Sequence, residues 1–243
     1  MKPLLLSWGS FQLFAYPLLM GIAWGLAYRL SDYFRVRLQI QIKSFPILFW
    51  GALVLSWIGA KLMFLLVSGG ELQATYLSSG NFWLGGGFVF YGGLILGAAW
   101  LVFLGLGLKH FELKQLYFIL PALTLGHAIG RVGCFLAGCC YGTQCNLAWA
   151  VKMHGHMLHP VQLYESALLL MVSLVLWKLV VAKNITYAWL TYLGGYGAIR
   201  FITEEYRGDI VRGFYGPLST SQWVSVAMMI IAITLAVRSR KEL

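Results

Sequence analysis

Charged residues are scarce in this 243-residue chain: only 11% of its residues are Asp, Glu, Lys or Arg, whereas 60% are hydrophobic. A soluble globular domain carries about 25% charged residues, which help to cover its surface. A chain with so little charge cannot cover a water-exposed surface, so the composition excludes an ordinary soluble domain. We therefore expect the lipid bilayer to be the solvent for most of the side chains.

Acidic residues are the scarcest charged group, with 8 Asp and Glu against 18 Lys and Arg, a net charge of +10. The basic residues gather at the ends of apolar segments, in alternate loops and at the C-terminus: Arg29, Arg35, Arg37, Lys43, Lys109, Lys114, Lys178, Lys183, Arg238, Arg240 and Lys241. The loop over residues 68–87 has no Lys or Arg. This alternation follows the positive-inside rule and predicts an external N-terminus and a cytoplasmic C-terminus. It explains the basic balance without a nucleic-acid partner, and none is expected.

Long apolar runs support a membrane protein. A spanning helix needs about 20 mostly apolar residues. Seven segments approach this length and predict seven transmembrane helices: 11–30, 47–67, 88–108, 116–135, 162–181, 187–201 and 224–237. The first segment is not expected to be a cleaved signal peptide, because no small-residue cleavage site follows its apolar core. No repeat or linker divides the chain, so the predicted fold is an all-α polytopic membrane protein with a single domain over residues 1–243.

Three polar residues lie one turn apart in the fourth apolar segment. His127, Arg131 and Cys134 have the spacing i, i+4, i+7, which places them on one face of a helix. An arginine inside the bilayer costs several kcal/mol and is usually retained because it binds or pairs with an anion. We therefore expect this segment to contribute to a functional site.

The same spacing recurs with Arg200, Glu204 and Arg207 near the end of the sixth segment. An internal ion pair between Arg200 and Glu204 would make a buried arginine tolerable. A bound anion that neutralises one arginine, while Glu204 orients its guanidinium, is the functional interpretation. The two interpretations are compatible, and the pattern alone does not choose between them.

Two more ionisable residues lie at membrane depth. Glu165 follows Pro160, which suits the first position of a helix, so the carboxylate falls within the second turn. A carboxylate there needs a partner or a proton, and we expect Arg131 to be the partner. Lys61 is expected to extend its ammonium group to an interface.

The four cysteines all lie in one segment, at positions 134, 139, 140 and 145. Their spacing differs from the paired C-x2-C pattern of common zinc sites, so no metal and no cofactor is expected. Three interpretations stay open. Two thiols could form a disulfide in an oxidising compartment, Cys134 could be a reactive thiol beside Arg131, or the cysteines could be small packing residues.

Four segments of the chain resemble the prolipoprotein diacylglyceryl transferase family. They are FYGGLILG at 90–97, GRVGCFLAGCCYG at 130–142, HPVQLYESALL at 159–169 and YGAIRFITEEYRGD at 196–209. Their order and spacing match the family across nearly the whole chain, and the first apolar segment is similar as well. The combination is more specific than any one motif.

The resemblance implies a multi-pass enzyme of the bacterial inner membrane whose active site faces the periplasmic half. Members of the family transfer the diacylglyceryl group of phosphatidylglycerol to the lipobox cysteine thiol of a prolipoprotein signal peptide, with release of glycerol phosphate. The implied partners are therefore phosphatidylglycerol, or another anionic phospholipid, and a prolipoprotein. Fixed guanidinium groups suit the charge that develops on a leaving phosphate.

The resemblance also implies roles for single residues. The implied catalytic residues are Arg131, Arg200 and Glu204, with Tyr91 at the position of the family's histidine; His127, one turn before Arg131, is our own candidate for the catalytic base. The implied substrate-binding residues are Tyr16, Gly92, Gly93, Cys134, Gly142, Glu165 and Arg207.

Three positions depart from the family's pattern. Tyr91 replaces its histidine, Cys134 its asparagine and Cys139 its glutamate. His127 could then supply the base that removes the thiol proton. These departures leave a second interpretation open: a catalytically altered relative that binds anionic phospholipid, or a membrane thiol–disulfide protein. A transporter has little support, because the sequence has no inverted repeat.

Overall fold

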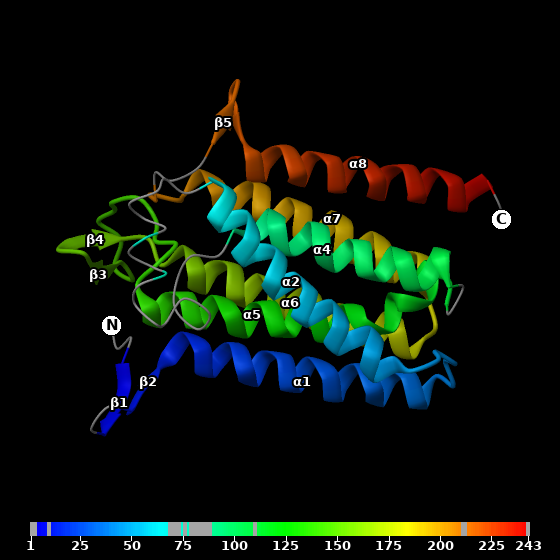
Figure 1. The fold of residues 1–243 in the computed structure, drawn as a ribbon. Coiled ribbons are helices and arrows are strands. Elements are labelled where there is room, and N and C mark those ends of the chain that lie inside the picture. The colour runs from blue at the N-terminus through cyan, green and yellow to red at the C-terminus, as the bar shows by residue number, and fades with distance from the viewer. Residues whose placement is uncertain are drawn as a thin grey trace. The chain divides into compact units, whose positions relative to one another are not determined.

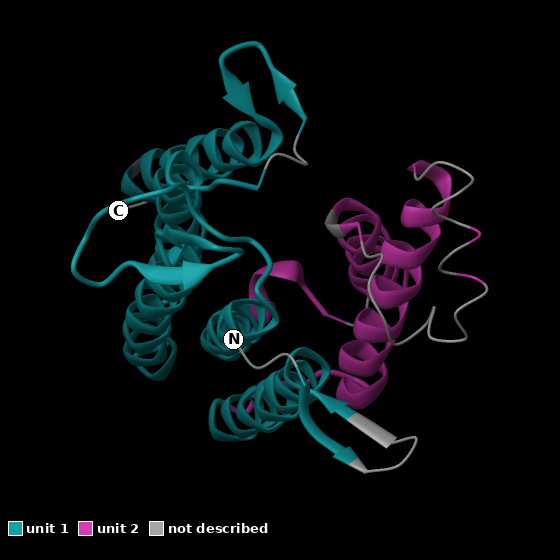
Figure 2. Ribbon diagram, turned by 90° about the vertical axis from the view of Figure 1, so that its left-hand side faces the viewer, with its two compact units in different colours: residues 1–38, 117–243 teal, residues 39–116 magenta. Residues whose placement is uncertain are grey.

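The computed structural model describes residues 4–8, 11–67, 74, 77, 89–108, 111–209 and 213–241. These residues are mostly helical, and they form two compact units (Figure 2). Unit 1 contains residues 1–38 and 117–243, and unit 2 contains residues 39–116. A single domain over residues 1–243 stays a prediction.

Unit 1 is a row of helices. Helix α1 (Ala15–Arg37) packs against α5 (Leu120–Ala137), which packs against α6 (Val161–Val181). Helix α7 (Ile185–Glu205) packs between α6 and α8 (Thr220–Lys241), and a 3-10 turn, η2 (Leu113–Ile119), leads into α5. The five long helices run side by side, from α1 at one edge of the unit to α8 at the other (Figure 1).

Unit 2 is built on the helix pair α2 (Phe45–Val67) and α4 (Phe90–Val102), and α4 continues into a π-helical turn, η1 (Phe103–Gly107). The two backbones touch where Gly59 meets Gly92, because a Cβ atom on either glycine would collide with the backbone carbonyl of the other. Small residues permit this close approach between membrane helices.

Each of the seven predicted apolar segments corresponds to a helix among the described residues. Within the described part of the chain, four helical segments are long and apolar enough to cross a membrane: Phe45–Val67, Leu113–Ala137, Val161–Val181 and Thr220–Arg240. Tyr91–Gly107 is a shorter apolar helix. The chain is therefore a mainly helical, multi-pass membrane protein, and the count of seven spans stays a prediction.

Two expectations are wrong. Residues 11–14, predicted as the start of the first spanning helix, form strand β2 (Phe11–Phe14), which pairs with β1 (Leu4–Trp8) in an antiparallel hairpin. A short apolar run does not distinguish a strand from a helix by its periodicity. Lys61 does not extend to a surface: its side chain is 0% exposed, because it lies on the buried face of α2 with Ala60 and Phe64.

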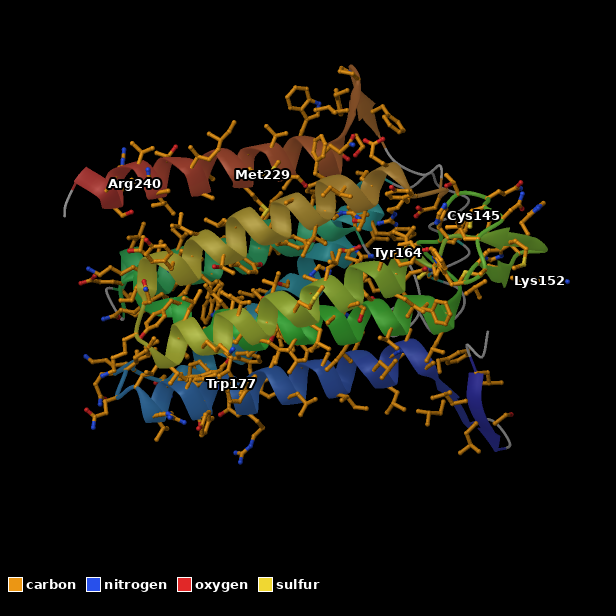
Figure 3. All side chains as sticks on the ribbon, turned by 180° about the vertical axis from the view of Figure 1, so that it is seen from behind. Cys145, Lys152, Tyr164, Trp177, Met229 and Arg240 are labelled. Carbon is orange, nitrogen blue, oxygen red and sulfur yellow. The ribbon has the colours of Figure 1, made fainter. Side chains whose placement is uncertain are left out.

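Two further hairpins lie at the end of unit 1 where α5 ends and α6 begins. They are β3 (Val151–Met153) with β4 (His156–Leu158), and β5 (Phe214–Tyr215) with β6 (Leu218–Ser219). We call this the hairpin end of unit 1. Cys145 and Lys152 lie there, whereas Arg240 lies at the opposite end (Figure 3). The last turns of α1 and α6 also carry basic residues, Arg35, Arg37 and Lys178, so we call this opposite end the basic end.

Candidate active site

The Glu165 carboxylate joins arginines from two other helices. Its Oε1 atom lies 2.8 Å from Nη2 of Arg131 on α5, and its Oε2 atom lies 3.6 Å from Nη1 of Arg200 on α7. Only 1% of the Glu165 side chain is exposed. The predicted pairing of Glu165 with Arg131 is therefore confirmed, and both guanidinium groups converge on a single buried carboxylate within unit 1.

Helix α5 places His127 one turn before Arg131. The Nε2 atom of His127 lies 3.7 Å from Oε1 of Glu165, and its ring meets Tyr196 of α7 with 5.1 Å between ring centroids. His127, Arg131 and Cys134 are all helical, as their spacing predicted. His127 therefore borders the same carboxylate as the two arginines.

Arg200 contacts one residue of its own helix and one residue of α8. Its Nη2 atom lies 2.6 Å from Oε2 of Glu204, one turn along α7, and donates a hydrogen bond of 3.0 Å to Oγ of Ser221 on α8. The internal ion pair predicted for Arg200 and Glu204 is confirmed. Ser221 escaped the sequence analysis because a serine at the start of an apolar helix gives no distinctive signal.

Two arginine donors of the site remain unused. Among the described residues, Nε of Arg131, Nη1 of Arg200 and the acceptor Oε1 of Glu165 are buried without a hydrogen-bond partner, although Nη1 of Arg200 faces Glu165 at 3.6 Å. A buried donor without a partner costs about 1–3 kcal/mol. The two guanidinium groups and the carboxylates of Glu165 and Glu204 balance in charge. An anion with several oxygen acceptors, such as a phosphodiester, would satisfy the unused donors.

Three loop segments cross at Gly142. Gly142 pairs with Arg207 in an antiparallel β-bridge and donates a hydrogen bond of 3.1 Å to the carbonyl of His159. Gly208 donates a hydrogen bond of 3.0 Å to the carbonyl of Tyr141. A Cβ atom on Gly142 would lie 2.5 Å from the His159 carbonyl oxygen, so the crossing requires glycine. The crossing ties together the end of α5, the start of α6 and the end of α7.

Arg207 does not share the helical face of Arg200 and Glu204. Helix α7 ends at Glu205, and Arg207 lies beyond it in the β-bridge. Its Nε and Nη2 atoms donate bidentate hydrogen bonds of 3.0 and 2.8 Å to the two carboxylate oxygens of Asp209. Burial raises the pKa of Asp209, against the effect of the Arg207 charge. The i+7 interpretation of Arg207 is therefore wrong, because the helix stops first.

Three of the four cysteines cluster at the end of α5. The Sγ atoms of Cys134, Cys139 and Cys140 lie within 4.8 Å of one another. All four cysteines lie in the described segment 111–209, and all four are free thiols. Hydrogen bonds with Cys134 and Cys139, assisted by the charges of Arg207 and Arg131, lower the pKa of the Cys140 thiol.

The other site residues predicted from the sequence lie on helices α1 and α4. Tyr16 packs on α5 where Gly133 leaves room, since a Cβ atom there would lie 3.2 Å from the tyrosine ring. Tyr91, Gly92 and Gly93 belong to α4 in unit 2, and their roles stay predictions.

Gln162 was not predicted as a site residue. Its Nε2 atom donates a hydrogen bond of 2.7 Å to the carbonyl of Cys139. Its signal was its place in the QLYE segment.

Comparison with known proteins agrees with these motifs. A family model described as prolipoprotein diacylglyceryl transferase matches residues 3–238. A phosphatidylglycerol–prolipoprotein diacylglyceryl transferase of Clostridium tetani is 39% identical over 62% of this chain and 63% of its own length. A protein of the same name from Finegoldia magna is 35% identical over 65% of this chain and 64% of its own length.

Another relative, phosphatidylglycerol–prolipoprotein diacylglyceryl transferase 2 of Clostridium perfringens, is 34% identical over 65% of this chain and 66% of its own length. The chain thus spans just under two thirds of the length of these relatives. The match of the family model is longer and reaches from β1 to the last turn of α8. The chain therefore belongs to the prolipoprotein diacylglyceryl transferase family.

Proposed function

We propose that this protein transfers the diacylglyceryl group of phosphatidylglycerol to the lipobox cysteine thiol of a prolipoprotein. The observation that carries this proposal is the convergence of Arg131 and Arg200 on Glu165, with one buried guanidinium donor of each arginine left unused. Membership of the family and the names of the relatives support it.

The site suits the chemistry of this transfer. The acceptor sulfur attacks a glycerol carbon of the lipid, a C–S bond forms, and the C–O bond to the phosphate breaks. The electron pair of that bond leaves with glycerol phosphate, so negative charge grows on the phosphate oxygens. Arg131 and Arg200 stabilise this charge in a site of low dielectric constant, where fixed donors are most effective. Glu165 and Glu204 hold the two guanidinium groups in place.

We assign the remaining roles to residues near the arginines and to residues of the family's motifs. His127 borders Glu165 and serves as the base for the thiol proton, with Tyr91 at the position of the family's histidine. The residues assigned to substrate binding are Tyr16, Gly92, Gly93, Cys134, Gly142, Glu165 and Arg207.

The proposed topology has seven spans, an external N-terminus and a cytoplasmic C-terminus in the bacterial inner membrane. The basic end of unit 1 would then face the cytoplasm, in keeping with the positive-inside rule. Arg131 lies toward the C-terminal end of α5, Glu165 in the first turns of α6 and Arg200 toward the C-terminal end of α7, on the side of the hairpin end. In this proposed topology the site would lie in the periplasmic half of the bilayer.

A transfer assay tests the proposal. The purified chain is reconstituted in phosphatidylglycerol vesicles with a lipobox peptide, and lipidated peptide and released glycerol phosphate are measured. We expect equal amounts of both products, and none with Arg131→Ala or with a peptide whose cysteine is serine. Arg238→Ala, an exposed arginine of α8, is the matched control and should retain turnover. Lipid binding without transfer would instead indicate a catalytically altered relative.

A further inference from the structure

The turn after α5 brings three thiols together that the linear spacing keeps apart. Helix α5 ends at Ala137, and Gly138 adopts a left-handed conformation with φ 76°. The backbone N–H of Cys139 then donates a hydrogen bond of 3.1 Å to the carbonyl of Cys134. Cys140 is also left-handed, with φ 60°. The chain therefore doubles back, and the Sγ atoms of Cys134, Cys139 and Cys140 lie within 4.8 Å of one another.

The backbone of this turn is fixed by its neighbours. The buried Gln162 side chain of α6 donates a hydrogen bond of 2.7 Å to the Cys139 carbonyl. The Nε2 atom of His154, in the turn between β3 and β4, lies 2.7 Å from the carbonyl oxygen of Gly138. A non-glycine residue at positive φ costs about 1–2 kcal/mol. Such strain persists where the surroundings enforce it, often at ligand sites.

The three sulfur positions are compatible with one common metal ion. A Zn–S bond is about 2.3 Å long, so three sulfur ligands of a common ion are about 3.8–4.0 Å apart. The observed spread of up to 4.8 Å reaches this arrangement by small side-chain rotations. A disulfide would link only two of the sulfurs, at about 2.05 Å. Thiolate ligands favour soft ions such as Zn(II) and Cu(I) over hard ions such as Mg(II).

We propose that Cys134, Cys139 and Cys140 bind one Zn(II) ion, whose open fourth position takes the thiol of the acceptor cysteine. Among the described residues, the ligand cluster contains these three side chains only. Three protein ligands and one exchangeable position characterise catalytic rather than structural zinc.

The second half of this inference rests on the proposed function. Zinc coordination favours the thiolate form of a thiol at neutral pH. The acceptor thiol binds the ion as a thiolate, and its proton leaves to water at this end of α5, where Cys139 is exposed. Its sulfur then forms the C–S bond to the lipid glycerol, and glycerol phosphate leaves with the electron pair of the broken C–O bond. Zn(II) is neither oxidised nor reduced, and the acceptor leaves as a thioether.

Metal binding is tested with the ion alone. The full-length protein, purified without metal under reducing conditions, is titrated with Zn(II) against a chromogenic chelator. We expect one equivalent to bind, and replacement of any one of the three cysteines by serine to lower the affinity more than about 100-fold. Cys145→Ser is the matched control, since Cys145 lies outside the cluster, and should bind like the unaltered protein. Absence of binding, or equal loss in Cys145→Ser, would overturn the site.

Co(II) supplies a readout that does not need activity. Co(II) in place of Zn(II) should show thiolate-to-metal charge-transfer bands and the strong visible bands of tetrahedral coordination. A lipobox peptide should change these bands, whereas the same peptide with serine for cysteine should not. Identical spectra with both peptides would overturn the open position and leave the three-thiol site standing.

The transfer assay separates this inference from the proposed function. Transfer that stops with a chelator and resumes with Zn(II) supports both. Transfer that continues in metal-free protein overturns the role of zinc and leaves the proposed function intact. One bound Zn(II) without any transfer overturns the acceptor role and the proposed function, and leaves the metal site.

Discussion

Glu165 Oε1 lies 2.8 Å from Nη2 of Arg131, and the carboxylate is almost completely buried. The pair links α6 to α5, and the two side chains are only 12% (Arg131) and 1% (Glu165) exposed. The same carboxylate also faces Arg200 at 3.6 Å. The negative charge of Glu165 therefore offsets the repulsion between the two arginines. We expect substitution of Glu165 to destabilise the site strongly.

Replacing Glu165 by glutamine removes the negative charge and keeps the shape of the side chain. Breaking a buried ion pair by removing one partner costs about 3–5 kcal/mol. We expect the free energy of unfolding of Glu165→Gln to fall by this amount, measured by denaturant titration in detergent micelles, and transfer to be lost. Glu112→Gln is the matched control, because Glu112 pairs with Lys114 on the surface. Equal stability of the two variants would contradict a buried pair.

Arg200→Lys keeps the positive charge but removes the planar guanidinium group, whose Nη2 atom contacts both Glu204 and Ser221. Loss of one oriented donor to a developing anion typically lowers kcat by about 100-fold or more. We expect such a fall in the transfer assay with little change in lipid binding, since lysine still attracts phosphate. Arg37→Lys, on the exposed surface of α1, should have no effect. Unchanged kcat in Arg200→Lys would mean that Arg200 does not contact the phosphate.

Gly142→Ala tests the crossing of the three loop segments. The new Cβ atom would press on the His159 carbonyl oxygen and on Val161, so the segments must separate. Overpacking of this kind costs about 1–3 kcal/mol, which circular dichroism during thermal unfolding can measure. Gly21→Ala in α1 is the control: its Cβ atom meets nothing within 4 Å, and stability should stay equal or rise. Similar unfolding midpoints for both variants would refute the tight crossing.

His127→Gln tests the assigned base. A positioned general base contributes about 10²–10⁴-fold to the rate. We expect kcat/KM to fall by this factor in the transfer assay. His156→Gln, at an exposed position of β4, should leave kcat/KM unchanged. Turnover of His127→Gln equal to that of the unaltered protein would exclude His127 as the base.

The helices and the central ion pair could be predicted from the sequence, because each has a local cause. Apolar runs must be buried in lipid, and a carboxylate at the depth of Glu165 needs a cation such as Arg131. The strand over residues 11–14 could not be predicted, since so short a segment with three apolar residues fits a strand or a helix equally well. Ser221 and Gln162 were missed because their contacts depend on how helices pack.

The thiol cluster could not be predicted from the sequence either. The spacing of Cys134, Cys139 and Cys140 resembles no common metal motif when it is considered along the chain. Their proximity depends on two successive reversals of the backbone, at Gly138 and at Cys140 itself. A left-handed cysteine is rare, so nothing in the sequence pointed to it.

The crossing at Gly142 also bears on how the protein responds to its bilayer. Membrane helices tilt when the hydrocarbon thickness changes. Helices α5, α6 and α7 are fastened to one another by backbone hydrogen bonds through Gly142, His159 and Gly208. The three helices should therefore tilt together as a rigid body. The distance between Arg131 and Arg200 should then be the same in short-chain and long-chain lipids. Acyl-chain length would then alter how deeply the headgroup sits, and leave the guanidinium pair undistorted.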